Sequence, residues 1–228
     1  MADFGYIKSN FEALSGEIEA LSSAQGRSVK LVAVTKSGSD EELMALCSFG
    51  AAAIGENRPG ELKRRGELLS AGGLRPELHQ IGNLQRNKVK MIIGAVDLIH
   101  SVDNLSLALE ISKQASAIGR VVDLLIEVNS AREEQKDGVL PEAAEELLLK
   151  VRELPSLRVR GLMTMGPVCD DSEELRPYFR LTKELFDRLN RAYDLDMDVL
   201  SMGMSDSYAV AIQEGATLVR VGRKLFNA

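Results

Sequence analysis

Short apolar runs alternate with longer amphipathic segments along most of this chain. The runs are four to eight residues long and are bounded by Gly, Asn, Asp or Ser, a pattern that predicts β-strands. Several are apolar on both faces, which is typical of parallel strands buried between a packed interior and an outer layer of helices. The predicted strands cover residues 30–34, 51–54, 77–81, 97–100, 121–128, 158–163, 199–202 and 218–221.

Segments with helical periodicity separate these runs. A first amphipathic helix is expected from Phe4 to about Ser23, where apolar residues recur every three or four positions. Further helices are expected over residues 41–49, 104–117, 142–152, 173–193 and 205–214. This order predicts an α/β fold with one domain, residues 1–228, built as a (β/α)8 TIM-type barrel with an extra N-terminal helix. An open doubly wound sheet is the other fold that the pattern allows.

The composition limits the partners. With a net charge of −6 and 45% hydrophobic residues, the chain reads as an acidic globular protein, so broad electrostatic binding to nucleic acid or anionic lipid is not expected. No apolar stretch approaches the ~20 residues that span a bilayer, and the N-terminus does not resemble a signal peptide. We therefore expect a cytoplasmic protein without membrane association. The chain has only two cysteines and two histidines, without metal-ligand spacing, and no metal site is expected.

Functional residues of a parallel barrel lie where the strands end, and the first strand ends next to a lysine. Lys36 comes just after the apolar run 31–34. At that place its amine enters the barrel mouth, where burial and nearby cations lower its pKa and make it a nucleophile toward aldehydes. A surface lysine on a loop is the alternative. Asp40 is expected to cap the helix that follows.

Two glycine-containing segments near the C-terminus are suited to holding a phosphate. SMGMSDSY, residues 201–208, joins a strand to a helix, so backbone amides at the helix start and the Ser205 hydroxyl are available to an anion. VRVG, residues 219–222, adds the guanidinium of Arg220 and a close backbone approach at Gly222. Together they resemble the phosphate site that the last two βα loops of many barrels form. A helix cap and an edge arginine are the structural alternative.

The methionines and histidines near the strand ends suit packing as well as binding. At least two of Met163, Met165, Met202 and Met204 are expected to fill the core. His79 and His100 lie within or at the end of strands and are expected to be hydrogen-bonded structural imidazoles. His79, which precedes IGN, is the better candidate for a pocket.

Seven strand-end motifs are distributed across nearly the whole chain. They are VAVTK, IGEN, HQIGNLQRNK, HSVD, EVN, GLMTMG and LSMGMSDSYAVAIQEGATLVRVG. In this order they resemble the YggS/PROSC family of pyridoxal phosphate-binding proteins. The resemblance implies a barrel like the N-terminal domain of alanine racemase. It also implies that pyridoxal 5′-phosphate (PLP) is held covalently, as an internal aldimine on Lys36.

The resemblance assigns the other contacts of this cofactor. It implies that the phosphate is held by the 201–205 loop and by the backbone near Gly222, while Arg220 faces the pyridine nitrogen. Side chains expected to line the pocket are those of Asn57, His79 and Met163. The full set of cofactor-binding residues is Lys36, Asn57, His79, Met163, Ser201, Gly203, Met204, Ser205, Arg220, Gly222 and Arg223.

Three places depart from the family pattern. Asn83 stands where a histidine is usual, which removes any role of that imidazole. Arg223 follows VRVG where Thr or Ser is usual, so a charged contact or the backbone alone replaces a hydroxyl contact to phosphate. Residues 58–60, Arg-Pro-Gly, follow GEN in place of an aliphatic residue and glutamine, and the start of the next helix is expected to differ.

Members of this family have no established catalytic activity and act in vitamin B6 and amino-acid homeostasis. The resemblance therefore implies a PLP-binding protein without catalytic residues, with PLP and PLP-dependent apo-enzymes as partners. A self-contained site is compatible with a monomer.

Two enzymatic functions are the alternatives. A PLP-dependent racemase or decarboxylase needs a second catalytic group, which related enzymes take from a C-terminal β domain and a partner subunit, whereas this chain stops six residues after Gly222. An arginine beside the pyridine nitrogen also weakens the ring as an electron sink. A Schiff-base aldolase would use Lys36 without a cofactor.

Overall fold

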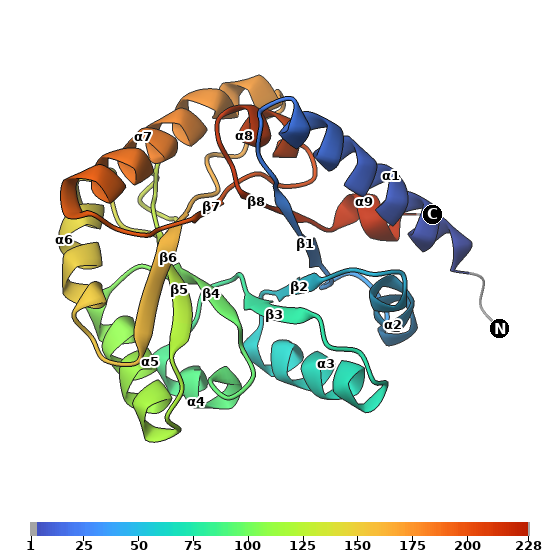
Figure 1. Ribbon diagram of the computed structural model, residues 1–228, viewed down its shortest axis with the longest axis horizontal. Coiled ribbons are helices and arrows are strands. Elements are labelled where there is room, and N and C mark those ends of the chain that lie inside the picture. The colour runs from blue at the N-terminus through green and yellow to red at the C-terminus, as the bar shows by residue number, and fades with distance from the viewer. Residues whose placement is uncertain (1–3, 228) are drawn as a thin grey trace.

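Eight parallel strands close into a barrel in the order of the chain (Figure 1). The computed structural model describes residues 4–227. Strand β8 pairs with β1 in parallel, which completes the ring and excludes the open doubly wound sheet. The strands are β1 Lys30–Val34, β2 Ala53–Glu56, β3 Glu77–Gln80, β4 Leu98–Val102, β5 Val122–Glu127, β6 Leu157–Met163, β7 Val199–Ser201 and β8 Leu218–Val221.

Helices cover the outside of the barrel (Figure 1). The extra N-terminal helix is confirmed as α1, and it contacts α2, α8 and α9. The α-helices are α1 Gly5–Ser23, α2 Asp40–Ser48, α3 Pro59–Ala71, α4 Val89–Ile92, α5 Leu105–Ala117, α6 Pro141–Arg152, α7 Arg176–Tyr193, α8 Tyr208–Gln213 and α9 Arg223–Phe226. Two short 3₁₀ turns, η1 Arg86–Lys88 and η2 Ser172–Leu175, precede α4 and α7. Among the described residues, none of the helices combines the length and apolarity needed to cross a lipid bilayer.

Two local predictions are wrong. Strand β2 starts two residues later than expected and continues through Gly55 and Glu56, because these residues pair in register with β3 despite their polar appearance. Asp40 does not cap α2. The cap is Ser39, whose Oγ accepts from the Glu42 N–H at 3.2 Å while the Glu42 carboxylate accepts from the Ser39 N–H at 2.6 Å.

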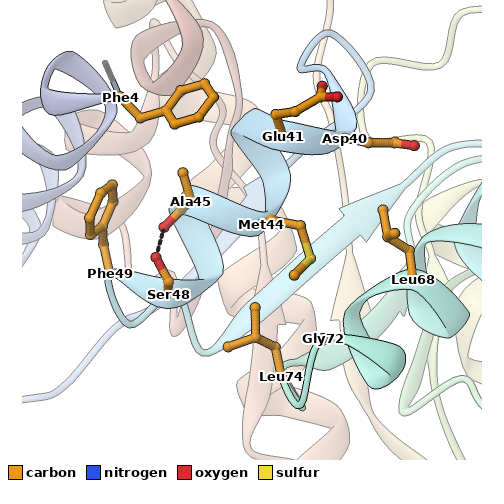
Figure 2. Close-up of a pocket in the computed structure, with 10 residues that line it drawn as sticks. All are labelled: Phe4, Asp40, Glu41, Met44, Ala45, Ser48, Phe49, Leu68, Gly72 and Leu74. Carbon is orange, nitrogen blue, oxygen red and sulfur yellow. Dashed lines mark hydrogen bonds between the residues drawn. The ribbon is translucent and has the colours of Figure 1, made fainter. Parts of the chain in front are cut away.

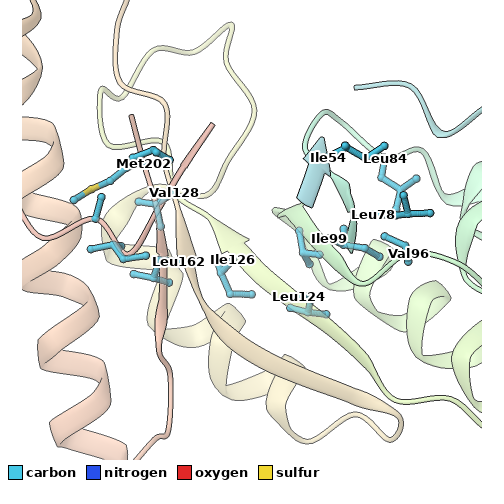
Figure 3. Close-up of a cluster of buried hydrophobic side chains, with 14 of the residues drawn as sticks. Ile54, Leu78, Leu84, Val96, Ile99, Leu124, Ile126, Val128, Leu162 and Met202 are labelled. Carbon is cyan, nitrogen blue, oxygen red and sulfur yellow. The ribbon is translucent and has the colours of Figure 1, made fainter. Parts of the chain in front are cut away.

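Apolar side chains occupy both faces of the sheet. The outward face packs with the helices in one large apolar cluster, which includes Ile54, Leu124 and Ile126 (Figure 3). A smaller cluster fills part of the interior and contains Val32, Ala53, Leu98, Leu125, Met163 and Leu218. The expected packing role of two methionines is confirmed, because Met163 and Met202 are buried, whereas Met165 and Met204 are exposed.

The two mouths of the barrel differ in character. At the amino-terminal ends of the strands, ion pairs join Arg158 and Arg160 to Asp123, Arg160 to Asp198, and Lys30 to Glu77. At the carboxyl-terminal ends lie the loops that carry the sequence motifs, as expected for a parallel barrel. The candidate site is therefore built at the carboxyl-terminal mouth.

Candidate functional site

Lys36 lies in a tight turn directly after β1. The Gly38 N–H donates to Thr35 O at 3.0 Å, so Lys36 and Ser37 occupy the central positions of the turn. The Lys36 side chain is exposed, so the predicted burial is wrong. Within residues 4–227 its amine has no hydrogen-bond or ion-pair partner. An amine in this state is free to react with a ligand at the mouth.

A buried arginine holds the backbone of this turn. Arg65 of α3 donates to the carbonyl of Thr35 and, at 2.8 Å, to the carbonyl of Gly38. It also forms an ion pair with Glu56 at 2.7 Å, and the two side chains are only 7% and 2% exposed. Thr35 Oγ1 donates to the same carboxylate. The backbone on either side of Lys36 and Ser37 is thus held by Arg65, while the Lys36 side chain is not held. Sequence analysis missed Arg65, whose role depends on the contact between α3 and the turn.

A chain of hydrogen bonds runs through the barrel interior to the eighth strand. We call it the interior relay, and its members are Glu77, His79, His100, Ser201 and Arg220. The Glu77 carboxylate lies 3.0 Å from His79 Nε2, and His79 Nδ1 lies 2.9 Å from His100 Nε2. His100 Nδ1 lies 3.0 Å from Ser201 Oγ, which accepts from the guanidinium of Arg220. Both histidines are buried and hydrogen-bonded, as expected of structural imidazoles.

Burial shifts the pKa values within the interior relay. Desolvation lowers the pKa of His100 well below its ordinary value, and the charge of Arg220 acts in the same direction, so this ring is neutral. Desolvation also lowers the pKa of Arg220 to about 10, which leaves the guanidinium charged at neutral pH. Hydrogen bonds from His79 and Lys30 lower the pKa of Glu77 to about 2. The interior relay therefore has a cation at one end and an anion at the other.

Glu127 is a further buried group at the mouth, and sequence analysis did not identify it. It ends β5 and is 8% exposed. Desolvation and the nearby charge of Asp103 raise its pKa to about 7, while Arg220 acts in the opposite direction. It borders a cavity of about 160 Å³ that is lined by residues 127–131, 135–137 and 164–166. A carboxyl with a raised pKa in a mouth is a common feature of functional sites.

The loops after β7 and β8 form a cradle of backbone N–H groups. Within the described part of the chain, the N–H groups of Gly203, Ser205, Asp206 and Arg223 donate to no protein acceptor. Ser205 Oγ accepts from the Gly222 N–H at 3.4 Å, which joins the two loops. Such unpaired donors around a concave backbone suit an anion.

Glycine is required at two positions of the cradle. Gly203 has φ +92°, and a Cβ there would lie 2.5 Å from the Cβ of Ala211. A Cβ on Gly222 would lie 2.8 Å from Val34 O. Because Val34 ends β1, the second contact also shows that the cradle lies beside the turn of Lys36.

The other residues predicted to bind the cofactor lie at different depths in the barrel. Asn57 is exposed just after β2, and its carbonyl accepts from Gln80 at 2.9 Å. Met163 belongs to the interior cluster, and His79 lies below the mouth in the interior relay. The Arg223 side chain extends into solvent and pairs with Asp206, so at this position the backbone N–H is the group left available.

A larger cavity lies outside the barrel. It measures about 660 Å³, and Figure 2 shows that residues of α2 and α3 line it together with Phe4. Its walls are mostly apolar and include Met44, Phe49, Leu68 and Leu74. It contains neither Lys36 nor a residue of the interior relay. The reactive groups of the candidate site therefore lie apart from this cavity.

The model of one protein family, described as alanine racemase, N-terminal domain, matches residues 9–228 of the chain. The chain belongs to this family. Within it, the chain is similar to the pyridoxal phosphate homeostasis protein of Aquifex aeolicus, with 44% identity over 222 residues, 95% of this chain and 96% of the relative. The protein of the same name from Helicobacter pylori is 40% identical over 224 residues, 96% and 98% of the two chains. The resemblance to the YggS/PROSC family is confirmed.

A solved structure agrees with this placement in the family. PipY of Synechococcus elongatus, solved with PLP bound, superimposes with a TM-score of 0.86 at 27% identity. The match covers 97% of this chain and all of PipY. The barrel described above is therefore the fold of a PLP-binding relative.

Proposed function

We propose that this protein binds PLP at the carboxyl-terminal mouth of its barrel, covalently through Lys36 Nζ, and acts in intracellular vitamin B6 and amino-acid homeostasis with little or no catalysis. One observation carries the proposal. The amine of Lys36, which has no partner among residues 4–227, lies on a turn at the end of β1. This turn adjoins a cradle of N–H groups that are likewise unpaired within those residues, at the end of the neighbouring strand β8. An aldehyde that carries a phosphate needs this pair of partners.

The donor set of the mouth fits each part of PLP. The N–H groups of Gly203, Ser205 and Arg223, with the Ser205 hydroxyl, suit a phosphate. The Lys36 amine suits the aldehyde, with which it condenses while water leaves. Arg220, which is charged and buried, suits the ring-nitrogen end. Asn57, Met163 and Met204 complete the proposed walls, with Ser201 and His79 supporting Arg220.

The residues around the ring favour holding the cofactor over using it. Bound PLP supplies an electron sink for amino-acid chemistry, and this sink is strongest when its ring nitrogen is protonated. Arg220 keeps its charge at neutral pH, so it disfavours a second positive charge on the neighbouring ring nitrogen. We infer slow chemistry, a role in supplying PLP to apo-enzymes, and a site that one chain completes.

Loss of the amine tests the covalent part of the proposal. Lys36→Ala is expected to abolish the mass increase that borohydride fixes after PLP is added, while weak noncovalent binding at the phosphate cradle remains. Lys113→Ala, which removes an exposed lysine from α5, is the matched control and is expected to retain full labelling. Intact-mass spectrometry measures both. Equal labelling of the two variants contradicts the assignment.

Assays for turnover test the remaining part. Racemisation of alanine at an ordinary enzyme rate, about 1 to 1000 per second, contradicts a binding role and favours an enzyme. Purified protein that stays colourless after PLP is added, yet forms a reducible adduct with a phosphorylated sugar, favours a cofactor-free aldolase. We expect neither result.

A further inference from the structure

The interior relay crosses the barrel from one mouth to the other. Its members come from β3, β4, β7 and β8. Strands β4 and β7 are not neighbours in the ring (Figure 1). The bond between His100 and Ser201 therefore spans the interior. Glu77 lies at the opposite end from the candidate site, where its carboxylate is 46% exposed and pairs with Lys30.

The chemistry of its members gives the interior relay a direction. A guanidinium only donates, so Ser201 Oγ accepts from Arg220 and its own proton is free to go to His100 Nδ1. The neutral His100 ring then carries its proton on Nε2 and donates to His79 Nδ1. His79 in turn carries its proton on Nε2 and donates to the Glu77 carboxylate, which only accepts. In this arrangement, in which Ser201 donates to His100 Nδ1, each bond donates toward Glu77.

The surroundings shield the middle of the interior relay from water. His79, His100 and Ser201 are 1%, 0% and 0% exposed. The apolar interior cluster of Val32, Leu98 and neighbouring side chains lies in the same space. In such an environment hydrogen bonds are strong and polarise one another, and a change at one end is felt along the chain. The far end of Arg220 is held too, by a bond from its guanidinium to Thr164 O at 3.2 Å.

We propose that the interior relay positions Arg220, so that Glu77 at the amino-terminal mouth controls the ring-nitrogen end of the cofactor site at the other mouth. Glu77, His79, His100 and Ser201 are positioning residues, since none of them needs to touch the cofactor. The inference rests on the proposed function for the identity of the ligand. The direction of the relay itself does not depend on that ligand.

The barrel offers a matched pair of carboxylates for the test. Glu77→Gln and Asp198→Asn each remove one negative charge from an exposed, ion-paired side chain at the amino-terminal mouth, but only Glu77 belongs to the interior relay. We expect Glu77→Gln to weaken PLP binding about threefold to tenfold and to move the visible absorption band of the bound cofactor. Asp198→Asn is expected to match the wild type in both. An identical response of the two variants overturns the proposal.

A double-mutant cycle tests whether the effect passes through Arg220. In an Arg220→Lys background, Glu77→Gln is expected to cause no further change in affinity or spectrum. The planar guanidinium that the interior relay positions is absent from this background. Additive losses contradict a relay. If the wild type binds no PLP at all, the proposed function is wrong. If the wild type binds PLP and Glu77→Gln changes neither the affinity nor the absorption band, only the proposed role of the interior relay is wrong.

A measurement without PLP tests the direction of the bonds. The chain contains only two histidines, so a protein labelled with nitrogen-15 in histidine gives just four ring signals. The directed relay places the proton that each ring donates along it on Nε2. This readout remains available if Arg220→Lys does not fold. A ring that carries a proton on Nδ1 contradicts the directed relay.

Discussion

The two ends of the candidate site hold their functional groups in opposite ways. At Lys36 the backbone is clamped by Arg65, while the side chain is exposed and its amine has no partner in the described part of the chain. At Arg220 the side chain itself is fixed, by Ser201 on one side and Thr164 O on the other. A nucleophile has to reach a ligand and change its bonding, whereas a group that orients a ligand has to keep its place. The difference shows which residue forms the bond and which sets its geometry.

Removing the clamp, which is the pair of bonds from Arg65 to the turn of Lys36, is expected to have the largest effect on stability and on covalent attachment. Arg65→Met leaves the Glu56 carboxylate buried without its cation, which costs about 3–5 kcal/mol of unfolding free energy. It also frees the carbonyls of Thr35 and Gly38, so covalent attachment to Lys36 is expected to slow more than phosphate binding weakens. Urea unfolding and the rate of appearance of the visible band measure the two effects.

The neighbouring arginine is the control for the clamp. Arg64 pairs with Asp40 and Glu61 on the surface, and Arg64→Met is expected to cost less than about 1 kcal/mol. Its rate of covalent attachment should equal that of the wild type. Equal behaviour of the two arginine variants would show that the turn needs no clamp.

Glu127, a buried carboxyl at the same mouth, is expected to make the unfolding free energy depend on pH. Its pKa is about 7 in the folded protein against 4.5 for the free group. Between these values the folded state holds a proton that the unfolded state has released, so this carboxyl makes the protein less stable as pH rises. Glu127→Gln removes that dependence, and its stability relative to the wild type should rise from pH 4.5 to pH 7, by about 3 kcal/mol at most, and then stay constant.

Denaturant unfolding at pH 5 and pH 8 measures this difference. The exposed Glu134 on the neighbouring loop supplies the control, and Glu134→Gln should show no such trend. A flat profile for Glu127→Gln would mean that the carboxyl is ionised throughout, in spite of its burial.

The helix cap beyond the turn of Lys36 gives the smallest effect. Ser39→Ala removes the capping bond at the start of α2 and is expected to cost about 1 kcal/mol. The amount of PLP bound at saturation should not change, because the clamp on the turn remains. Thermal unfolding measures the loss, and Ser37→Ala, whose hydroxyl has no hydrogen-bond partner among residues 4–227, should be nearly neutral. A larger loss for Ser37→Ala would place the important hydroxyl inside the turn.

Much of the fold was predictable from the sequence because its signals are local. Strands apolar on both faces, separated by amphipathic helices, predict a parallel barrel, and the functional residues of a barrel lie at the strand ends. The expected place of Lys36 after β1 follows from this rule, as does the place of the 201–208 segment after β7. The cap of α2 was assigned to Asp40 instead of Ser39, since both residue types suit that role.

The rest depends on contacts between distant segments. The bond between His79 and His100 requires β3 and β4 to align, and the bond from His100 to Ser201 requires the barrel to close. No pattern within a single strand carries that information. Arg65 likewise looks like one of several charged residues on a polar helix until α3 packs under the turn of Lys36. The sequence shows which residues end each strand, and the closed barrel shows which of them meet.

The most direct measurement is reduction and peptide mapping of the unmodified protein. PLP is added, the adduct is fixed with borohydride, and the digested protein is analysed by mass spectrometry. We expect one pyridoxyl label, on the peptide that contains Lys36. A label on any other lysine, or a protein that takes up PLP without a reducible bond, would contradict it.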